Sequence, residues 1–227
     1  MQKMFEIQER KTSADVVFDD QYEPIGSLNL LPGTKISETE IATRFGISRQ
    51  PVRDSFSRLS NLSLLLIRPQ KATVVKEFSL DGIATARFVR LSVELEVMRK
   101  AATLWDGSLL AEFEENLRIQ ESAHAAKDID KLHEIDYEFH KPLCHVGNSD
   151  FAFDTISQNK AQVDRFCVLS LTSARGIRQL IDDHKLILSQ LSQNDADGVC
   201  DTLRLHLSRL DDTITAIHKS HASYFEN

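Results

Sequence analysis

The stretch PGTKISETEIATRFGISRQPVRDSFSRL, residues 32–59, determines the fold of the N-terminal part of the chain. Its opening proline and glycine mark a turn. Ser37 and Glu40 have the spacing of a capping box, in which each side chain bonds to the backbone of the other residue. We therefore expect a helix that begins after Ser37 and runs to about Phe45.

A second helix is expected directly after a break at Gly46. Ser48 can cap this helix, and Pro51 is tolerated in its first turn because the amide that proline lacks has no partner inside the helix there. The helix is expected to run to about Asn61. Two short helices joined by a tight glycine turn form a helix-turn-helix.

Short runs of β-branched and aliphatic residues follow, on either side of a basic loop. Residues 64–67 and 73–75 have the composition of two strands, and the Arg-Pro-Gln-Lys loop between them would form a wing. Before the helix-turn-helix, residues 13–29 have a helical pattern whose second half is interrupted by Pro24. Together these elements predict a winged helix-turn-helix domain over residues 1–77.

The rest of the chain has helical patterns and no strand signal. We expect a second domain over residues 78–227, an all-α bundle of six helices, so the fold class is mainly α. The six helices are expected at residues 80–104, 107–126, 128–146, 150–172, 174–193 and 195–220.

Charge is distributed unevenly along the chain. The net charge is −7, but from Gly33 to Lys76 eight basic residues stand against three acidic ones, which leaves +5 there and −12 on the remainder. Phosphate binding needs local positive charge. One short basic segment in an acidic chain therefore predicts a single DNA-facing module on a body that avoids DNA.

The second helix of the helix-turn-helix carries Arg49 and Arg53 four residues apart, on one face. Arginine pairs bidentately with guanine in the major groove or holds backbone phosphate. The alternative is a solvated basic helix face with no ligand. If the segment reads DNA, the residues expected to contact it are Ser48, Arg49, Gln50, Arg53, Arg58 and, in the wing, Lys71.

Composition excludes several other classes of protein. No stretch approaches the roughly 18 uninterrupted apolar residues of a membrane-spanning helix, and the first residues lack the apolar core of a secretory signal. We expect a cytoplasmic protein with no membrane partner. Cys144, Cys167 and Cys200 form no CxxC pair and are odd in number, which argues against a disulfide framework and a thiolate zinc site.

Polar residues interrupt the apolar stripes of three expected helices. His184 and His206 each lie within such a stripe, and Asp136 and His140 lie four residues apart on or beside a third. A buried aspartate is costly unless its charge is compensated, and a divalent cation held by three imidazoles would compensate it. Zinc or nickel suits these ligands best, and manganese is the less favoured option. The alternative is a set of hydrogen-bonded core histidines, with Asp136 and His140 bonding to each other.

The run GISRQPVRDSF, residues 46–56, with the turn and the ISETEIA run before it, resembles the GntR family of transcription regulators. The resemblance covers residues 30–76. It implies that Arg49 and Arg53 contact operator bases or phosphates.

This sequence departs from the family pattern at three positions. The family usually has glycine where this chain has Ser63 and Ala72, and an uninterrupted first helix where it has Pro24. Glycine is preferred in loops whose backbone has positive φ, so its replacement is expected to strain or tilt the wing.

The second domain is similar to the FCD effector domain of FadR-type GntR regulators, over about residues 79–216. The six expected helices look like those of the VanR-type group. The resemblance implies a divalent metal bound by one aspartate and three histidines, with an effector carboxylate completing its coordination. The runs that carry it are Arg90-Leu-Ser-Val-Glu94, Asp136-Tyr-Glu-Phe-His140, Gly147-Asn148, Asp183-His184 and His206-Leu207.

Arg90 matches the arginine that faces the effector carboxylate in this family. Its planar guanidinium suits bidentate pairing with a carboxylate. An equally weighted alternative is a structural ion pair between Arg90 and Glu94 within one helix. Arg87 and Arg165 are weaker candidates for the effector contact.

These expectations combine into a homodimeric repressor, not an enzyme, whose two winged domains bind half-sites of an operator. A small organic acid would bind the metal and alter operator affinity. One rival is a metal-dependent hydrolase, because a metal with open coordination positions can activate water. Against it, no additional carboxylate or histidine is clearly placed as a general base. The other is a constitutive DNA-binding protein with a purely structural metal.

Overall fold

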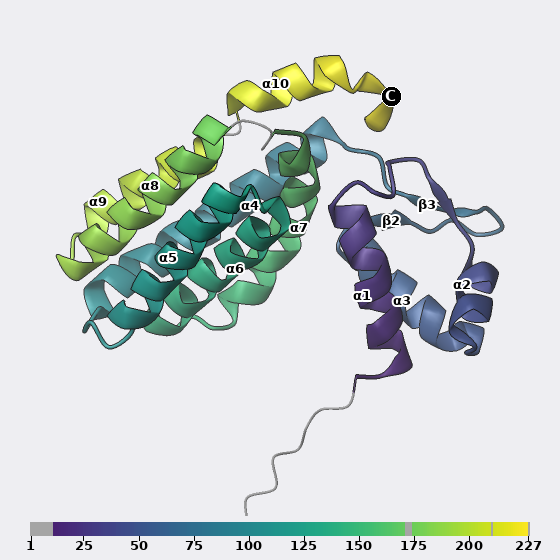
Figure 1. The fold of residues 1–227 in the computed structure, drawn as a ribbon, viewed down its shortest axis with the longest axis horizontal. Coiled ribbons are helices and arrows are strands. Elements are labelled where there is room, and N and C mark those ends of the chain that lie inside the picture. Colours follow the sequence, from purple (N-terminus) through teal and green to yellow (C-terminus); the bar gives the residue numbers. More distant parts are fainter. Residues whose placement is uncertain (1–10, 171–173, 210, 227) are drawn as a thin grey trace, which may run out of the picture. The chain divides into compact units, whose positions relative to one another are not determined.

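The computed structural model describes residues 11–170, 174–209 and 211–226. The chain divides into two compact units, Met1–Lys76 and Glu77–Asn227, one residue before the boundary expected from the sequence. Helices predominate in both units (Figure 1), so the predicted mainly α class is confirmed. None of the helices in the described ranges is long and apolar enough to cross a membrane.

From residue 11 onward, the first unit contains three helices and a small antiparallel sheet with strand order β1-β3-β2. Ile36 of β1 lies opposite Thr73 of β3, and Leu66 of β2 lies opposite Val74. The first strand was not predicted, because two residues are too short to show an alternating pattern. The elements are α1 (Ser13–Gly26), β1 (Lys35–Ile36), α2 (Glu38–Phe45), α3 (Arg49–Asn61), β2 (Leu65–Leu66) and β3 (Thr73–Val75).

The core of this unit lies between α1, α3 and the sheet. Val17 of α1 and Val52, Phe56 and Leu59 of α3 are fully buried, and Val75 closes the core from the sheet. Burying each such side chain contributes roughly 1.5–3 kcal/mol. The apolar spacing of α3 thus fixes which of its faces points inward and leaves its basic face exposed.

The caps of α2 and α3 differ. The Ser37 hydroxyl accepts a hydrogen bond from the backbone N–H of Glu40, which is the expected start of α2. Gly46 ends α2 with φ of 64°, a left-handed conformation that favours glycine. Ser48 occupies the N-cap position of α3, but its side chain makes no hydrogen bond to the helix. The prediction that its hydroxyl caps α3 is therefore wrong.

The three departures from the family pattern have different structural consequences. Ser63 has φ of 57°, so a non-glycine residue does occupy a left-handed position before β2. Ala72 is not among the residues with positive φ; Gln70, two residues earlier, has φ of 57° instead. Pro24 lies in the last turn of α1 and does not interrupt the helix before that point. Only the departure at Ser63 places a side chain in a strained backbone conformation.

The second unit is all helical in its described residues, with one helix more than expected. The predicted final helix, 195–220, is two helices, because Arg209 ends the first and turns its guanidinium back to Asp183 on α8. Both pieces are amphipathic, which hides the break in the sequence. The helices are α4 (Leu80–Leu104), α5 (Leu110–Ala126), α6 (Ile129–Val146), α7 (Ala152–Ser170), α8 (Ala174–Ser192), α9 (Ala196–Ser208) and α10 (Asp211–Ser220).

Helix α4 is central to the bundle, where it contacts α6, α7, α8 and α9. The C-terminal residues return to its start: the Phe78 N–H donates to the Tyr224 carbonyl, and the Glu226 N–H donates to the Phe78 carbonyl, both at 2.8 Å. The rings of Phe78, Phe166 and Phe225 pack against one another, and all three are buried. The tail therefore belongs to the folded unit.

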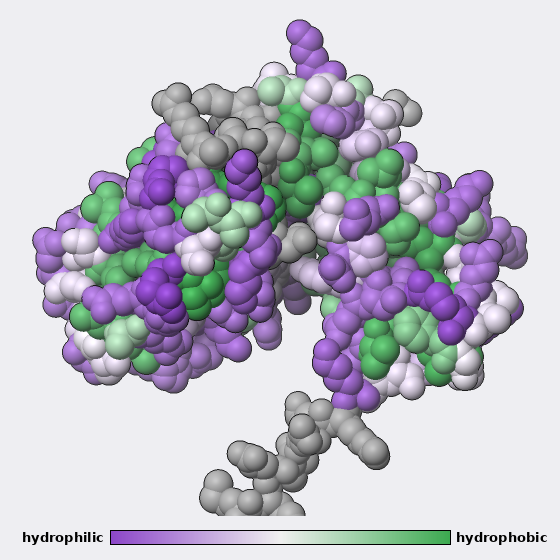
Figure 2. All heavy atoms as spheres, viewed as in Figure 1, coloured by the Kyte–Doolittle hydropathy of each residue, from purple (hydrophilic) through white to green (hydrophobic). Residues whose placement is uncertain are grey.

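The side chains of two of the three cysteines are described. Cys144 and Cys200 are unpaired and buried; the side chain of Cys167 lies outside the described residues. The visible surface is mainly hydrophilic, with small apolar patches between the polar side chains (Figure 2). Among the described residues, the most exposed large apolar side chains are Phe88 on α4 and Phe151 just before α7.

We expect the Ser63→Gly variant to be more stable than the wild type by about 0.5–1 kcal/mol. Glycine removes the steric cost of a left-handed side chain, roughly 1–2 kcal/mol, at the expense of extra entropy in the unfolded chain. Ala72→Gly is the matched control, which gains no such relief and is expected to lose about 0.5–1 kcal/mol. Urea denaturation of both variants measures the difference; equal effects would contradict the conformation at Ser63.

Candidate metal centre

Four polar side chains converge in the interior of the second unit. Asp136 and His140 come from α6, His184 from α8 and His206 from α9, and all four are buried. Each offers one ligand atom, and these atoms lie within 4.8 Å of one another. In a tetrahedral zinc site the ligand atoms lie about 2.1 Å from the ion and roughly 3.4 Å from one another. The four side chains would therefore move inward to hold a single ion.

Three of the inward-facing atoms lack a hydrogen-bond partner among the described residues. They are Oδ1 of Asp136, Nε2 of His140 and Nε2 of His184. Oδ1 of Asp136 lies 3.4 Å from Nε2 of His184 and 3.9 Å from Nε2 of His140. Each unsatisfied buried polar atom costs about 1–3 kcal/mol. A divalent cation would satisfy all three at once, so the residues present fit such an ion.

The second ring nitrogen of each histidine faces an oxygen of a further buried side chain. Such outer contacts fix the orientation and tautomer of histidine ligands in metal sites. The separations are 2.9 Å from His140 Nδ1 to Glu94 Oε2, 2.9 Å from His184 Nδ1 to Gln120 Oε1, and 3.5 Å from His206 Nδ1 to Asp183 Oδ2.

His184 is held most completely. The Phe139 ring stacks on its imidazole, with centroids 4.0 Å apart and planes 13° apart. Gln120, which faces its Nδ1, donates to the Asn116 side-chain oxygen at 2.6 Å, and Asn116 donates to the Ile135 carbonyl at 3.0 Å. A chain of hydrogen bonds therefore links the backbone of α6 to the imidazole on α8.

Neighbouring groups keep Asp136 ionised and His184 neutral, which are the protonation states that bind metal ions. Burial raises the pKa of Asp136, but the charge of Lys160 and the neighbouring histidines outweigh it, so that pKa lies well below its ordinary value. Burial and the neighbouring His206 lower the pKa of His184 well below its usual range. An ionised carboxylate and a neutral imidazole are the forms that bind metal ions.

Lys160 on α7 is a buried cation that was not among the site residues predicted from the sequence. Its Nζ lies 3.0 Å from Asp136 Oδ2 and 2.8 and 2.9 Å from the two carboxylate oxygens of Asp164. Burial lowers the pKa of Lys160, but these two carboxylates more than reverse that effect, so the lysine stays charged. The signal was present: Lys160 continues the apolar stripe of Ala152 and Ile156 at four-residue spacing.

Arg90 forms the ion pair with Glu94 that the sequence analysis held as an alternative to an effector contact. Burial raises the pKa of Glu94, but Arg90 and His140 outweigh it and lower that pKa to about 2. Nη2 of Arg90 is buried and without a hydrogen-bond partner among the described residues. Arg87 donates to a backbone oxygen of α9. Arg165 lies buried over the ring of Phe78 in the C-terminal cluster.

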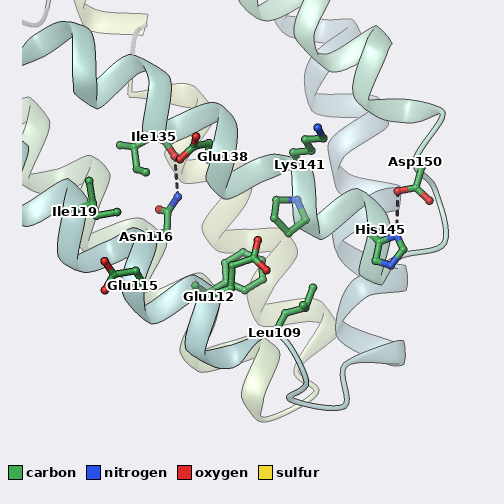
Figure 3. A pocket seen from close by; sticks show the side chains of 12 residues that line it. Leu109, Glu112, Glu115, Asn116, Ile119, Ile135, Glu138, Lys141, His145 and Asp150 are labelled. Carbon is green, nitrogen blue, oxygen red and sulfur yellow. Dashed lines mark hydrogen bonds and ion pairs between the residues drawn. The ribbon is translucent and has the colours of Figure 1, made fainter. Parts of the chain in front are cut away.

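A groove of about 590 Å³ lies between α5 and α6, and its lining includes Asn116 but none of the four candidate ligands. Figure 3 shows the Asn116 amide pointing to the backbone at Ile135, and His145 facing Asp150 at one end. Because Asn116 also bonds to Gln120, hydrogen bonds link the lining of the groove to the candidate centre.

The predicted DNA-contacting residues divide into two groups. Ser48, Arg49, Gln50 and Arg53 are exposed at the start of α3, and Lys71 is exposed between β2 and β3. Exposed ion pairs such as that of Arg53 with Glu38, at 3.0 Å, contribute little to stability and are easily exchanged. These side chains are therefore free to meet phosphates or bases.

Arg58 is held differently from the other candidates. Its guanidinium donates to Asp15 at 2.7 Å and lies 4.2 Å from the centre of the Phe18 ring, so it contacts α1. Helical spacing alone places Arg58 with the predicted DNA-contacting residues, because it does not reveal a partner 43 residues away.

Comparison with known families covers both units. Residues 17–75 match the family described as "Bacterial regulatory proteins, gntR family", and residues 86–209 match the FCD domain. The chain is 33% identical over 196 residues to the HTH-type transcriptional repressor RspR of Escherichia coli strain K12, covering 86% of each chain. It is 22% identical over 170 residues to the gluconate operon transcriptional repressor of Bacillus licheniformis, covering 73% of this chain and 70% of that one.

Solved structures share the fold. Escherichia coli McbR/YncC matches with a TM-score of 0.76 and 20% identity, covering 93% of this chain and 100% of that chain. A putative GntR regulator from Rhodococcus sp. RHA1 matches with a TM-score of 0.71 and 19% identity, covering 91% of this chain and 99% of that one. At these identities the similarity shows the arrangement of helices alone.

We expect Gln120→Leu to lower the free energy of unfolding of the metal-free protein by about 1–3 kcal/mol, because it leaves the buried His184 Nδ1 without its partner. Divalent metal affinity should fall by about 10–100-fold, because the imidazole loses its orientation. Gln190→Leu is the matched control: Gln190 accepts from Thr202 at 2.8 Å, away from the centre. Unchanged metal affinity in Gln120→Leu, or an equal loss in both variants, would contradict the orienting role.

Proposed function

Because the chain belongs to the GntR family of bacterial regulatory proteins and carries an FCD domain, we propose that this DNA-binding transcriptional regulator is a repressor controlled by a divalent metal ion and a small carboxylate effector. The members of the family and the relatives of the chain are transcription regulators, not enzymes. The observation that carries the proposal is the meeting of three buried, unsatisfied ligand atoms beside His206.

Asp136, His140, His184 and His206 would hold the ion, with zinc or nickel favoured by the imidazole ligands and manganese less so. The bound ion would supply a Lewis-acidic point to which a carboxylate oxygen can bind. Arg90 is the proposed second contact of the carboxylate, since its Nη2 remains unpartnered while its Nε is bonded to Glu94.

Operator binding is proposed for the start of α3. Its exposed Ser48, Arg49, Gln50 and Arg53 suit base and phosphate contacts, and Lys71 in the wing suits phosphate. Arg58 is expected to contribute by fixing α3 on α1 rather than by touching bases. Two copies of the chain would address two half-sites, and the cytoplasm, where bacterial operators lie, is the proposed location.

Regulation would follow from different affinities of the effector for two arrangements of the dimer. The relative named as a gluconate operon repressor makes sugar acids one class of carboxylate to test. Release of operator DNA on effector binding is the outcome we propose. A purely structural metal, with constitutive DNA binding, is the alternative that the following measurement separates.

We expect purified wild-type protein to contain about one divalent ion per chain and His184→Ala to bind it at least about 100-fold more weakly, since a ligand itself is lost. At least one acid in a panel of hydroxy, sugar and aromatic acids should raise the thermal unfolding temperature of the wild type. His145→Ala, an exposed histidine outside the centre, is the control and should behave as the wild type. Metal content is measured by elemental analysis.

Two results would count against this proposal. Absence of metal from the wild type would remove the basis of effector binding. Metal at one ion per chain, with no acid changing the unfolding temperature or operator binding, would favour the structural role.

The DNA surface is tested separately. Arg49→Ala and Arg53→Ala are each expected to weaken binding to the operator by about 1–3 kcal/mol, roughly 5–150-fold. The operator is first selected from random duplex DNA by the wild type, and affinity is then measured at fixed salt. Arg118→Ala, an exposed arginine on α5 paired with Glu115, is the control. Failure of the wild type to enrich any sequence would sink the assignment of this surface.

A further inference from the structure

The charged side chains around the candidate metal centre form a compact set among the described residues. Arg90 pairs with Glu94, and Lys160 lies between Asp136 and Asp164. Two cations therefore accompany three carboxylates, and the set carries a net charge of −1. All but Asp164 are more than nine-tenths buried, so water screens these charges poorly.

In the described part of the chain, the charged pair next to this set adds nothing to its charge. Arg209 pairs with Asp183 at 2.5 and 2.7 Å, which leaves that pair neutral beside His206. Histidines that bind a metal are neutral. A divalent ion would change the net charge of the set from −1 to +1. Because uncompensated charge is costly in a protein interior, the loaded centre would favour a ligand that brings one negative charge.

We propose that Lys160 and Asp164 set the charge of the effector, so that this centre accepts a singly charged carboxylate in preference to a dianion. The inference rests on the proposed function, since it requires a divalent ion and a carboxylate at the centre. Without the charge of Lys160 the loaded centre would be neutral and would attract anions weakly. Without the charge of Asp164 it would carry +2 and would suit a dianion.

Lys160 exerts this effect without touching the effector. Its ammonium group is already occupied by both carboxylates and lies 4.0 Å from the centre of the Tyr137 ring. It therefore acts through Asp136, whose Oδ2 it holds while Oδ1 stays turned to the histidines. Lys160 is a positioning residue that also fixes the electrostatic balance of the centre.

A purely structural ion pair would behave differently. Breaking a buried pair lowers stability, but a brace alone would not change the relative affinity of the centre for anions of different charge. Charge selectivity is therefore the readout that separates the two roles.

The test uses full-length protein loaded with Co²⁺, whose visible absorption responds to a change of ligand, and titrates it with acetate and with malonate. Co²⁺ affinity is measured in parallel by competition with a chelating dye. The variants are Lys160→Met, Lys160→Arg and Asp164→Asn. Asp154→Asn, an exposed aspartate on the same helix, is the control.

At saturating Co²⁺ we expect Lys160→Met to bind acetate about tenfold more weakly, because a positive charge has left the centre. Lys160→Arg should restore acetate binding. Asp164→Asn should raise the malonate-to-acetate affinity ratio by about tenfold. Comparing this ratio between variants removes the advantage that malonate has as a chelating ligand.

The outcomes separate this inference from the proposed function. If the wild type takes up no Co²⁺, or its spectrum responds to neither anion, the proposed function fails. If metal and anions bind but Asp164→Asn keeps the wild-type ratio, the charge-setting role alone is overturned. Asp164 is partly exposed, so its variant is expected to fold and carries the test even if Lys160→Met does not.

Discussion

The ionised carboxylate of Asp136 in the interior of the helical bundle is the constraint around which the second unit is arranged. A buried charge is tolerated only where other groups compensate it. One oxygen of Asp136 is compensated by Lys160, while the other faces two histidines that supply no hydrogen bond to it. One oxygen of the carboxylate is thus paired and the other is not. This arrangement suits a ligand-binding site better than a closed hydrophobic core.

Side chains from three helices face the histidines around the unpaired oxygen of Asp136. Helix α4 contributes Glu94, α5 contributes Gln120 and α8 contributes Asp183, each facing the outer nitrogen of one histidine. Lys160 on α7 holds Asp136 as well, so an ion at the centre would contact groups whose positions depend on six helices of the bundle, α4 to α9. Such an ion would couple the packing of these helices to its own coordination, which is the physical requirement for a ligand to shift the equilibrium between two arrangements.

The two units differ in the location of the charged side chains that matter for the proposed function, as well as in their fold. The basic face of α3 stays exposed because its apolar residues are committed to the core with α1. In the second unit, a set of opposite charges is buried around Asp136, in addition to the ion pairs on its surface. The proposed DNA recognition thus depends on exposed side chains, and the proposed sensing depends on buried ones.

Most of the helices and the four candidate ligands could be predicted from local sequence patterns. Local patterns predicted α2, α3 and the wing, and the four candidate ligands followed from polar residues inside apolar stripes, because helical periodicity fixes which residues face inward. Local sequence patterns did not predict the ion pairs of Lys160, the contact of Gln120 with His184, the attachment of Arg58 to α1 or the break at Arg209. Each depends on a partner from another element, brought close only when the helices pack. Periodicity shows the face of a helix on which a residue lies, whereas the packing of the helices determines which residues that face contacts.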